Sequence, residues 1–431
     1  MVEPLVIPRS EHPISRRSID PDALRVLYRL KEAGFTAYLV GGSVRDLMLG
    51  RKPKDFDIGT SAHPYQVKRL FRNCFIIGRR FRLAHVKFGQ KVIEVATFRR
   101  QVPAGESEEP PPATPPGPEG AAAPEEPRDL LIHRDNTFGT PEEDAFRRDF
   151  TVNALAYDIA TFSIIDYVGG LEDLRAKLIR SIGDPDERFR EDPVRMLRAI
   201  AFASRLDFRV DQPTYEAIGR HRMELARSSP ARLLEEYYKI LRSGAAERTF
   251  GALAGVGLLE PVTPELQHGA SDRLWASLAD VDRYRRRFEA TPPSLTNAIL
   301  AGSVLVPLGF TPDPFARREP SGRPTPPPQL GPLPLARKDI ERLRHILLLQ
   351  RRLHDVSLSP KAARGVMARI AFSDALGWLD IHGHAADLVE RWRTLASAAA
   401  ASDPARQGPG PTVPRRRRRR RRRRFPGPSQ T

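Results

Sequence analysis

Residues 39–58 have the sequence LVGGSVRDLMLGRKPKDFDI, which combines a Gly-Gly pair with two aspartates one residue apart. Residues 37–40 predict a short apolar strand, and Gly41-Gly42 predicts a turn that opens a helix carrying Arg45. Backbone N–H groups and the helix dipole at such a turn favour a phosphate group. The first half of the segment therefore predicts a phosphate-binding turn.

Two aspartates, Asp55 and Asp57, follow in the same segment. Residues i and i+2 of a strand point to the same face, so the two carboxylates are expected to converge. Paired carboxylates suit Mg²⁺, which usually takes one or two of them and completes its shell with water and substrate phosphates. An isolated Asp-x-Asp is more often a solvated strand edge, but the phosphate-binding turn beside it favours a nucleotidyl-transfer site.

The chain has 431 residues, 40% of them hydrophobic, which is enough for two or three domains with a sizeable core. Its net charge is +17, and ten consecutive arginines near the C-terminus account for ten of these charges. The charge that remains is still positive, and a basic body favours a polyanionic partner.

One cysteine, Cys74, excludes an internal disulfide and a cysteine zinc cluster, and it fits a reducing cytoplasm. Residues 1–15 lack the apolar core of a signal peptide. The longest apolar stretch, about residues 298–310, contains Gly and Ser and is too short to span a bilayer. We expect a soluble, cytoplasmic protein with no membrane partner.

The pattern of apolar residues predicts an α+β head, a small mixed sheet with helices, followed by an all-α neck and body. Strands are predicted at residues 37–40, 56–58, 75–77, 84–88 and 92–98, and helices at 21–33, 44–49, 64–71, 193–205, 212–222, 230–243 and 245–254. The predicted parts are an N-terminal extension (1–20), the head (21–180), a helical neck (181–310), a Pro-rich linker (311–335), a helical C-terminal domain (336–401) and a disordered Arg-rich tail (402–431).

A Pro- and Glu-rich insertion, residues 103–128, interrupts the predicted head. Residues 103–127 contain nine prolines and six glutamates, with no Lys or Arg. Such a segment cannot bury enough apolar surface to offset the entropy of ordering, so a disordered loop is expected.

A second polar cluster, Arg147-Arg148-Asp149, precedes an apolar stretch. Arginine can bind phosphate with two donors at once, and Asp149 could supply the third carboxylate of a two-metal site. Glu94, in the predicted strand 92–98, competes for that role. Taken alone, the cluster would also fit a surface patch of ion pairs.

A third cluster contains Glu191, Asp192, Arg195 and Arg198. Asp192 before Pro193 has the pattern of a helix N-cap followed by proline at the first helical position. Arg195 and Arg198 are three residues apart and share a helix face that could contact base edges and phosphate. The alternative is a capped helix with exposed arginines.

The segments at residues 39–46, 53–57, 147–154, 166–174 and 190–202 together resemble the class of nucleotidyltransferases that contains bacterial poly(A) polymerases and CCA-adding enzymes. The resemblance spans roughly residues 37–245 and agrees in order and spacing. It implies that Asp55 and Asp57 hold Mg²⁺ and that Asp149, preferred to Glu94, is the third catalytic carboxylate. It implies nucleotide-binding roles for Gly41, Gly42, Arg45, Arg148, Glu191, Asp192, Arg195 and Arg198, with Glu191, Asp192 and Arg195 selecting the base.

Three further segments, residues 76–86, 138–145 and 230–236, resemble the poly(A) polymerase branch more than the CCA-adding branch. The implied activity is template-independent transfer of AMP from ATP to RNA 3′ ends by two-metal phosphoryl transfer, with a neck that binds nucleotide and RNA. Two alternatives stay open: a CCA-adding or A-adding tRNA nucleotidyltransferase, and a non-catalytic RNA-binding protein that has kept the fold.

The Arg-rich tail is expected to be extended, because like charges repel. Such a run should add salt-dependent, sequence-independent RNA affinity through counterion release. The alternative is a tail that aids solubility or binds other acidic partners. The residues predicted to bind RNA are Arg415, Arg416, Arg417, Arg418, Arg419, Arg420, Arg421, Arg422, Arg423 and Arg424.

Overall fold

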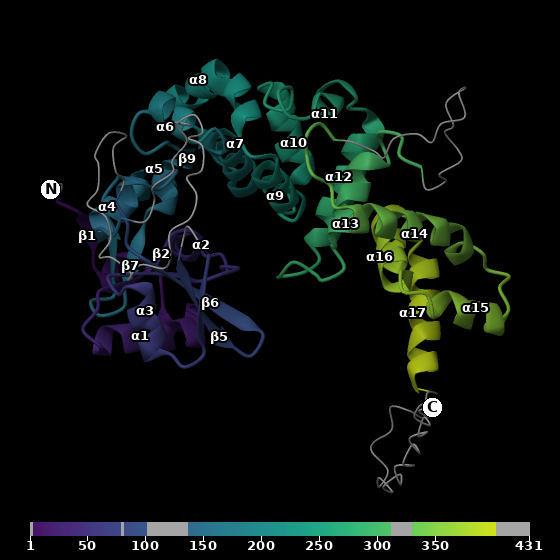
Figure 1. Ribbon diagram of the computed structural model, residues 1–431, viewed down its shortest axis with the longest axis horizontal. Coiled ribbons are helices and arrows are strands. Elements are labelled where there is room, and N and C mark those ends of the chain that lie inside the picture. Colours follow the sequence, from purple (N-terminus) through teal and green to yellow (C-terminus); the bar gives the residue numbers. More distant parts are fainter. Residues whose placement is uncertain (1–2, 79–81, 101–136, 312–329, 402–431) are drawn as a thin grey trace, which may run out of the picture. The chain divides into compact units, whose positions relative to one another are not determined.

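A computed structural model of the protein describes residues 3–78, 82–100, 137–311 and 330–401 (Figure 1). It divides into two compact units, Met1–Leu348 and Leu349–Thr431. The predicted insertion at 103–128, most of the predicted linker and the whole Arg-rich tail lie outside the described residues. The predictions for these segments therefore stay predictions.

The first unit contains a mixed sheet that includes eight strands within the described residues. β3 and β6 are parallel, and the other neighbouring pairs are antiparallel. The strand order is β1-β8-β7-β2-β3-β6-β5-β4. The strands are β1 (Leu5–Ile7), β2 (Ala37–Val40), β3 (Asp57–Thr60), β4 (Cys74–Ile77), β5 (Leu83–Phe88), β6 (Lys91–Thr97), β7 (Ala156–Asp158) and β8 (Ser163–Asp166).

Helices α1 (Pro21–Glu32) and α3 (Pro64–Leu70) contact the central strands and the β4–β6 end of the sheet, respectively. α1 begins where the sequence predicts, because the Asp20 side chain accepts hydrogen bonds from the backbone N–H groups of Asp22 and Ala23 and Pro21 follows the cap. Alternate strand residues are buried, for example Ala84 and Val86 of β5. One face of this end of the sheet is thereby buried beneath α3.

Helices dominate the rest of the first unit. Among them α7 contacts α6, α9 and α10, so it connects the sheet-bearing part of the unit to the helical part. These helices are α2 (Gly42–Met48), α4 (Pro141–Phe146), α5 (Gly170–Ala176), α6 (Pro185–Glu191), α7 (Val194–Leu206), α8 (Gln212–His221), α9 (Pro230–Leu241), α10 (Ala246–Gly255), α11 (Pro264–His268), α12 (Asp272–Arg285), α13 (Asn297–Leu305) and most of α14 (Arg337–Leu353).

The remaining short elements are the parallel strand pair β9 (Leu178–Ile179) and β10 (Arg209–Val210) and the 3-10 turns η1 (Arg9–Glu11), η2 (Arg16–Ser18), η3 (Thr151–Asn153) and η4 (Arg222–Arg227). α13 coincides with the apolar stretch noted in the sequence, and eight consecutive residues from Ala298 to Leu305 are buried in it. No helix in the described part of the chain is long and apolar enough to cross a membrane.

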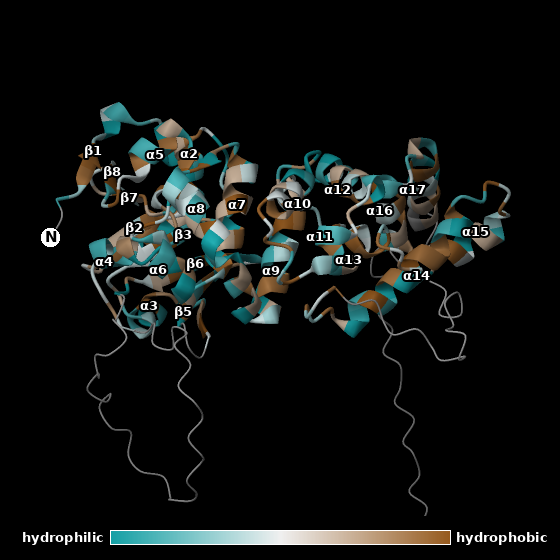
Figure 2. Ribbon diagram, turned by 90° about the horizontal axis from the view of Figure 1, so that it is seen from above, coloured by the Kyte–Doolittle hydropathy of each residue, from teal (hydrophilic) through white to brown (hydrophobic). Residues whose placement is uncertain are grey.

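The second unit includes the end of α14 and helices α15 (Pro360–Met367), α16 (Phe372–His382) and α17 (Ala386–Ala401). Its core forms around Trp392, which stacks edge-on against Phe372 and donates a hydrogen bond to the carbonyl of Leu353 at 2.9 Å. Hydrophobic and hydrophilic residues alternate along α14 in Figure 2, as expected of an amphipathic helix.

The predicted fold class is confirmed for the described residues: a mixed sheet with helices, followed by helices alone. Two local predictions are wrong. β3 begins at Asp57, so Asp55 precedes the strand and strand alternation does not place its side chain. Asp192 is not the N-cap of α7; Pro193 is, and Asp192 follows the last residue of α6, a helix that was not predicted. The finer domain boundaries stay predictions.

Gly170 and Gly219 form a matched pair that tests the packing of the first unit. A Cβ added at Gly170 would lie 2.3 Å from the backbone oxygen of Thr151, whereas nothing lies within 4 Å of a Cβ at Gly219 in α8. Gly170→Ala should lower the free energy of unfolding by about 1–3 kcal/mol because the backbone must move. Gly219→Ala should raise it by about 0.5–1 kcal/mol. Denaturant titration measures both, and equal effects would contradict this account.

Candidate active site

The Gly41-Gly42 turn forms as predicted between β2 and α2. Gly41 has φ = 74°, a conformation that favours glycine, and its N–H donates a hydrogen bond to the carbonyl of Leu155 at 3.1 Å. A Cβ at Gly41 would lie 2.9 Å from Nη1 of Arg148. The missing side chain therefore lets the Arg148 guanidinium lie directly against the turn.

Three carboxylates meet at the start of β3. The parallel pairing of β3 with β6 places Asp57 opposite Glu94, and paired residues project to the same face. The burial of its carboxylate and the negative charges of Glu94 and Asp55 together raise the pKa of Asp57 to about 6, while Arg148 opposes the shift. Asp57 nevertheless keeps more than a third of its surface exposed, so a ligand can reach it.

Asp55 is open to solvent, with 74% of its side chain exposed and Lys54 at 3.8 Å. Within the described residues no group of three or more His, Cys, Asp or Glu side chains is arranged to hold a metal ion. The oxygen donors of Asp55 and Asp57 still fit Mg²⁺, because this ion takes only one or two carboxylates when substrate phosphates complete its shell.

Arg45 faces the interior. It is 2% exposed, and its donors reach the Asp46 carboxylate at 2.7 and 2.9 Å and the side-chain oxygen of Asn153. Its guanidinium also lies 5.4 Å from the ring centre of Phe202. These contacts hold α2 against η3, and a phosphate would have to share the Arg45 donors with Asp46 or Asn153.

Arg147 and Arg148 are held by Asp144 of α4, at 2.9 and 3.0 Å. Burial would raise the pKa of Asp144, but the two guanidiniums outweigh burial and lower it. About a quarter of each arginine side chain stays exposed. The pair is thus ordered and still accessible to an anion.

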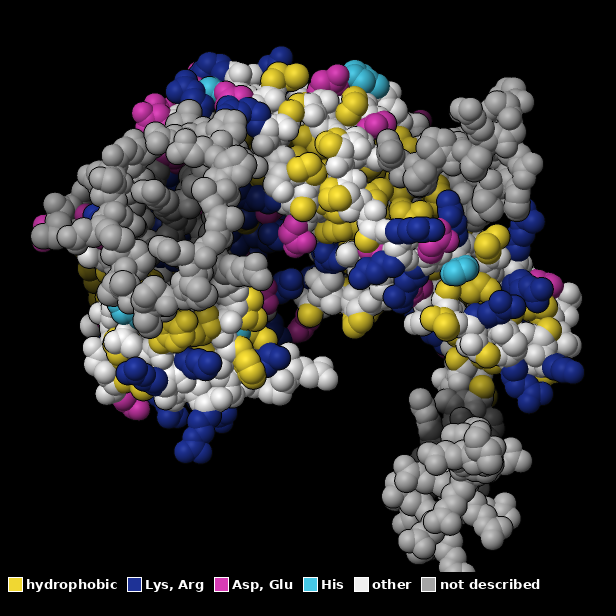
Figure 3. All heavy atoms as spheres, viewed as in Figure 1, with side chains coloured by type: hydrophobic (Ala, Val, Ile, Leu, Met, Phe, Trp, Pro, Cys, Tyr) yellow, Lys and Arg dark blue, Asp and Glu magenta, His cyan; other side chains and the backbone are white. Residues whose placement is uncertain are grey.

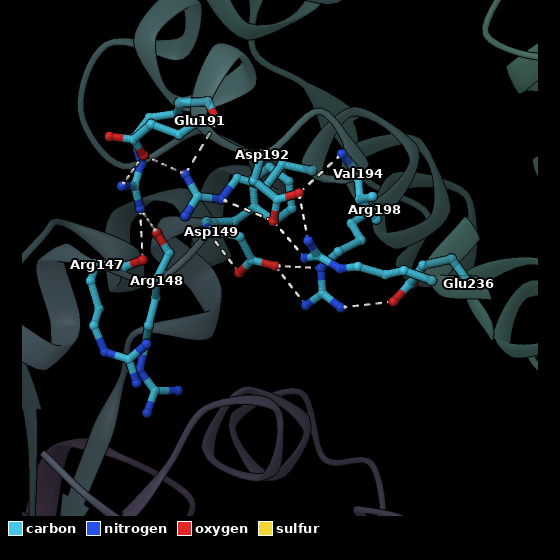
Figure 4. Close-up of polar contacts among 12 residues, drawn as sticks. Arg147, Arg148, Asp149, Glu191, Asp192, Val194, Arg198 and Glu236 are labelled. Atoms are coloured by element: carbon cyan, nitrogen blue, oxygen red, sulfur yellow. Dashed lines mark hydrogen bonds and ion pairs between the residues drawn. The ribbon is translucent and has the colours of Figure 1, made fainter. Parts of the chain in front are cut away.

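Asp149 forms a largely buried ion pair with Arg198 of α7, at 2.6 Å (Figure 4). Its other oxygen accepts hydrogen bonds from the side chain of Asn153 and from the N–H of Phe150. Burial would raise the pKa of Asp149, but Arg198 and these hydrogen bonds lower it. Arg198 also contacts Glu236 of α9 at 3.5 Å. In Figure 4 the side chains of Arg147 and Arg148 extend away from this pair.

Glu191 and Asp192 are positioned by arginines from several elements. Glu191 contacts Arg188 at 2.9 Å and Arg195 at 3.2 Å. Asp192 receives two hydrogen bonds from Arg232 of α9, and its Oδ1 also accepts from the N–H of Val194 at 3.3 Å. The connection between α6 and α7 therefore presents carboxylates and guanidiniums in fixed positions.

Arg188 connects this group to the second arginine cluster. Its Nη2 donates to the carbonyls of Arg147 and Arg148 at 2.7 and 2.6 Å, while Nη1 binds Glu191. Burial lowers the pKa of Arg188, and the charge of Arg195 lowers it further. The sequence clusters at 147–149 and 191–198 are thus one connected network.

Arg205 and Phe202 are two residues that the sequence analysis missed. Arg198, Phe202 and Arg205 follow one another at spacings of four and three on one face of α7, and both guanidiniums lie 5.2 Å from the ring centre of Phe202. Burial and the charge of Arg45 together lower the pKa of Arg205 to about 10. The helical spacing was visible in the sequence and could have indicated this arginine face.

The predicted residues thus form two groups. Asp55, Asp57 and Glu94 lie at the sheet, whereas Asp149 lies in the network that contains Glu191, Asp192, Arg195 and Arg198. Arg148 connects the groups, because its charge acts on Asp57 and its Nη1 donates to the carbonyl of Asn153. Glu94 faces Asp57 across the β3–β6 pairing, and the role of Asp149 as third catalytic carboxylate stays a prediction.

The model of the poly A polymerase head domain matches residues 37–180. A model described as "Probable RNA and SrmB- binding site of polymerase A" matches residues 207–269, and one of the polymerase A arginine-rich C-terminus matches residues 329–424. All three models describe parts of polymerase A, and the chain is similar to them over these three ranges. The resemblance inferred from the sequence is therefore confirmed.

Members of both branches are similar to the chain. It is 50% identical over 261 residues to Poly(A) polymerase I of Salmonella typhi, covering 61% of this chain and 54% of the relative. It is 37% identical over 239 residues to the CCA-adding enzyme of Bacillus velezensis, covering 55% of this chain and 54% of the relative. The chain spans about half the length of the curated relatives it matches.

Solved structures of the family share the fold. The Bacillus stearothermophilus CCA-adding enzyme in complex with CTP aligns with a TM-score of 0.54 and 25% identity, over 88% of this chain and 83% of that one. The Thermotoga maritima CCA-adding enzyme in complex with tRNA aligns with a TM-score of 0.52 and 20% identity, over 90% and 86%.

The raised pKa of Asp57 predicts a pH-dependent stability. Between about pH 4 and 6 the folded protein binds more protons at this site than the unfolded chain, so stability falls as pH rises through this window. Asp57→Asn should therefore be more stable than the wild type at pH 7 in metal-free buffer, and the difference should vanish near pH 4. Denaturant titration at both pH values measures this.

Asp20→Asn is the matched control, since asparagine also caps helices. Burial would raise the pKa of Asp20, but Lys91 and the N–H groups of Asp22 and Ala23 lower it. This carboxylate contributes stability above its unfolded pKa, so Asp20→Asn should destabilise the protein at pH 7. A stabilising Asp20→Asn or a destabilising Asp57→Asn would contradict the electrostatic account.

Proposed function

We propose that the chain is a polynucleotide adenylyltransferase that transfers AMP from ATP to the 3′ ends of RNA without a template. The observation that carries the proposal is the group of Asp55, Asp57 and Glu94 beside Arg148 and the Gly41-Gly42 turn. Cation-binding oxygens and phosphate-binding donors thus converge at one end of the sheet. The similarity to Poly(A) polymerase I exceeds that to the CCA-adding enzymes and supports AMP transfer.

Asp55 and Asp57 would hold Mg²⁺, with Glu94 facing Asp57 from the neighbouring strand β6. When bound, two such ions supply the positive charge that activates the attacking hydroxyl and stabilises the leaving pyrophosphate. The repulsion between the three carboxylates favours a cation, because the cation removes the penalty that now raises the pKa of Asp57. Asp149 would position Arg198, since its oxygens already accept four hydrogen bonds.

The arginines would bind and orient the triphosphate. Arg148 lies against Gly41 and keeps part of its surface exposed, so it can donate to a phosphate placed at the turn. Arg45 would fix the position of the turn through Asp46 and Asn153. Arg205 stands on the same face of α7 as Arg198 and offers a further cation to the phosphate chain.

Glu191, Asp192 and Arg195 would select the base. A carboxylate accepts hydrogen bonds and a guanidinium donates them, so the three together can match the donor and acceptor pattern of one base edge. Arg188 and Arg232 hold the two carboxylates in place. A cytoplasmic location belongs to the same proposal, because RNA and ATP are found there.

The decisive experiment offers ATP or CTP with Mg²⁺ to the purified protein, with an oligo(A) primer or a tRNA that ends before its CCA. Long A tails on oligo(A) are expected. Asp55→Asn and Asp57→Asn should each lower AMP transfer by at least about 10²-fold, because charge stabilisation in the transition state is lost. Mg²⁺ should raise the melting temperature of the wild type and not that of Asp57→Asn.

The matched control is Asp22→Asn, a surface carboxylate on α1 that contacts Arg25 and Lys91. It should keep full activity and the Mg²⁺-dependent shift. Incorporation of CTP on tRNA would support the CCA-adding alternative, and no transfer at all would support an RNA-binding protein. Full activity in either aspartate variant would overturn the site assignment.

The Arg-rich tail is proposed to add sequence-independent RNA affinity by counterion release. Truncation after Ser402 should weaken binding of labelled RNA and reduce the slope of log affinity against log salt. Replacing Arg415–Arg424 with lysines is the control, since it keeps the charge and should keep most of the slope. Equal affinity and slope in the truncated and full chains would contradict the proposal.

A further inference from the structure

The β4–β6 end of the sheet has one buried and one open face. Alternate residues, among them Val86 of β5 and Val95 of β6, are buried on the side that α3 covers. The residues between them emerge on the other face. By register, Asp57 of β3 pairs with Glu94, Glu94 with His85, and His85 with Phe75, so these four side chains form one row across the open face.

The row continues from the carboxylates into an apolar and cationic surface. The exposed fraction is 54% for Phe75, 48% for Ile77 and 39% for Val92, which is large for hydrophobic side chains gathered on one face. The ammonium of Lys87 lies 5.3 Å from the ring centre of Phe75. His85 stands between this surface and the carboxylates, 3.6 Å from Glu94.

We propose that this surface, the β4–β6 face formed by Phe75, Ile77, His85, Lys87 and Val92, binds the 3′-terminal nucleotides of the RNA acceptor. The proposal rests on the proposed function and assigns it an acceptor site. An exposed aromatic ring stacks on a base of any sequence, and a lysine beside it neutralises a phosphate. Both groups are present here within contact distance of each other.

Distance along the row fits the acceptor. Neighbouring strands lie about 4.8 Å apart, so Phe75, three strands from Asp57, stands about 14 Å from that carboxylate. The reacting 3′-hydroxyl must lie at the carboxylates. The preceding nucleotides of the RNA must then lie on a protein surface adjacent to the carboxylates. The β4–β6 face is continuous with the carboxylates, and its exposed ring and ammonium suit bases and phosphates.

RNA fits this face better than a protein partner does. A protein docked across the row would cover Asp57 and Glu94 and block the reaction that the carboxylates support. In Figure 3, hydrophobic and Lys or Arg side chains lie close together over the part of the head where Figure 1 labels β5 and β6. Apolar surface interleaved with cations is typical of single-strand binding.

The test uses the full chain and two substitutions, Phe75→Ala and Lys87→Gln. At saturating ATP, Phe75→Ala should raise the KM for oligo(A) about tenfold or more, the effect of losing one stacked base. Lys87→Gln should raise it less and in a salt-dependent way. The KM for ATP and the Mg²⁺-dependent melting shift should stay unchanged, because neither residue reaches the nucleotide network. Phe75→Tyr should retain wild-type values.

Tyr65→Ala is the matched control. Tyr65 is 56% exposed and lies beneath Arg82 at 5.8 Å, but it belongs to α3 on the covered side of the sheet. This variant should leave the KM for oligo(A) unchanged. An unchanged KM for oligo(A) in Phe75→Ala would overturn the proposal. If sedimentation showed that this variant changes self-association while its KM for oligo(A) is unchanged, the surface would instead be a contact between copies of the chain.

Failure of the proposed function would be seen separately, as absence of AMP transfer by the wild type. In that case, the acceptor site is tested by measuring the binding of labelled oligo(A) in the absence of nucleotide. It is measured at elevated salt, where counterion release contributes less. Weaker binding by Phe75→Ala than by the wild type and Tyr65→Ala would support the acceptor site. Equal binding by all three proteins would overturn it.

Discussion

The ion pair between Asp149 and Arg198 is the contact on which the arrangement of the site depends. It joins the segment after α4 to helix α7, and Arg198 extends the connection to Glu236 of α9. Breaking one partner of a buried pair typically costs about 3–5 kcal/mol, because the remaining charge is left without compensation. Helix α7 is therefore fixed in position and rotation relative to the sheet, and it carries Arg195 and Arg205 with it.

Most arginines of the site have an acceptor within the protein, whereas the three carboxylates at the sheet repel one another. The arginines Arg45, Arg147, Arg148, Arg188 and Arg198 all donate to carboxylates or carbonyls. At the sheet the reverse holds, since Asp55, Asp57 and Glu94 repel one another and the pKa of Asp57 is raised. These arginines each have an acceptor within the protein, while the carboxylates carry a cost that a cation would remove. The arginine contacts therefore stabilise the fold, whereas the repulsion between the three carboxylates destabilises it.

Local patterns predicted the elements well. β2, the start of α3 and the strands β4–β6 were expected from short apolar runs, and the Gly-Gly turn from its residues. Long-range pairing could not be predicted in this way. That β3 runs parallel to β6, and so places Glu94 beside Asp57, depends on a register between distant segments. For the same reason the sequence did not reveal that Arg198 of α7 is the partner of Asp149.

The direction in which a side chain points was the second feature that the sequence could not predict. The motif spacing identifies Arg45 but does not reveal that its guanidinium turns inward to Asp46 and Asn153. The helix start assigned to Asp192 was displaced because α6, which ends at Glu191, carries no strong apolar periodicity of its own. Caps and turns depend on the backbone on both sides, and the sequence shows only that a polar residue precedes a proline.

The pairing of β1 with β8 has a consequence for how the chain folds. Leu5 pairs with Asp166, so the first strand of the chain completes one edge of the sheet next to a strand made much later. Closing so large a loop costs entropy that local contacts do not recover, which slows folding. During synthesis β1 stays unpaired until β8 has left the ribosome. The end of the sheet from β3 to β6 can form before that, because all of its strands lie within the first hundred residues.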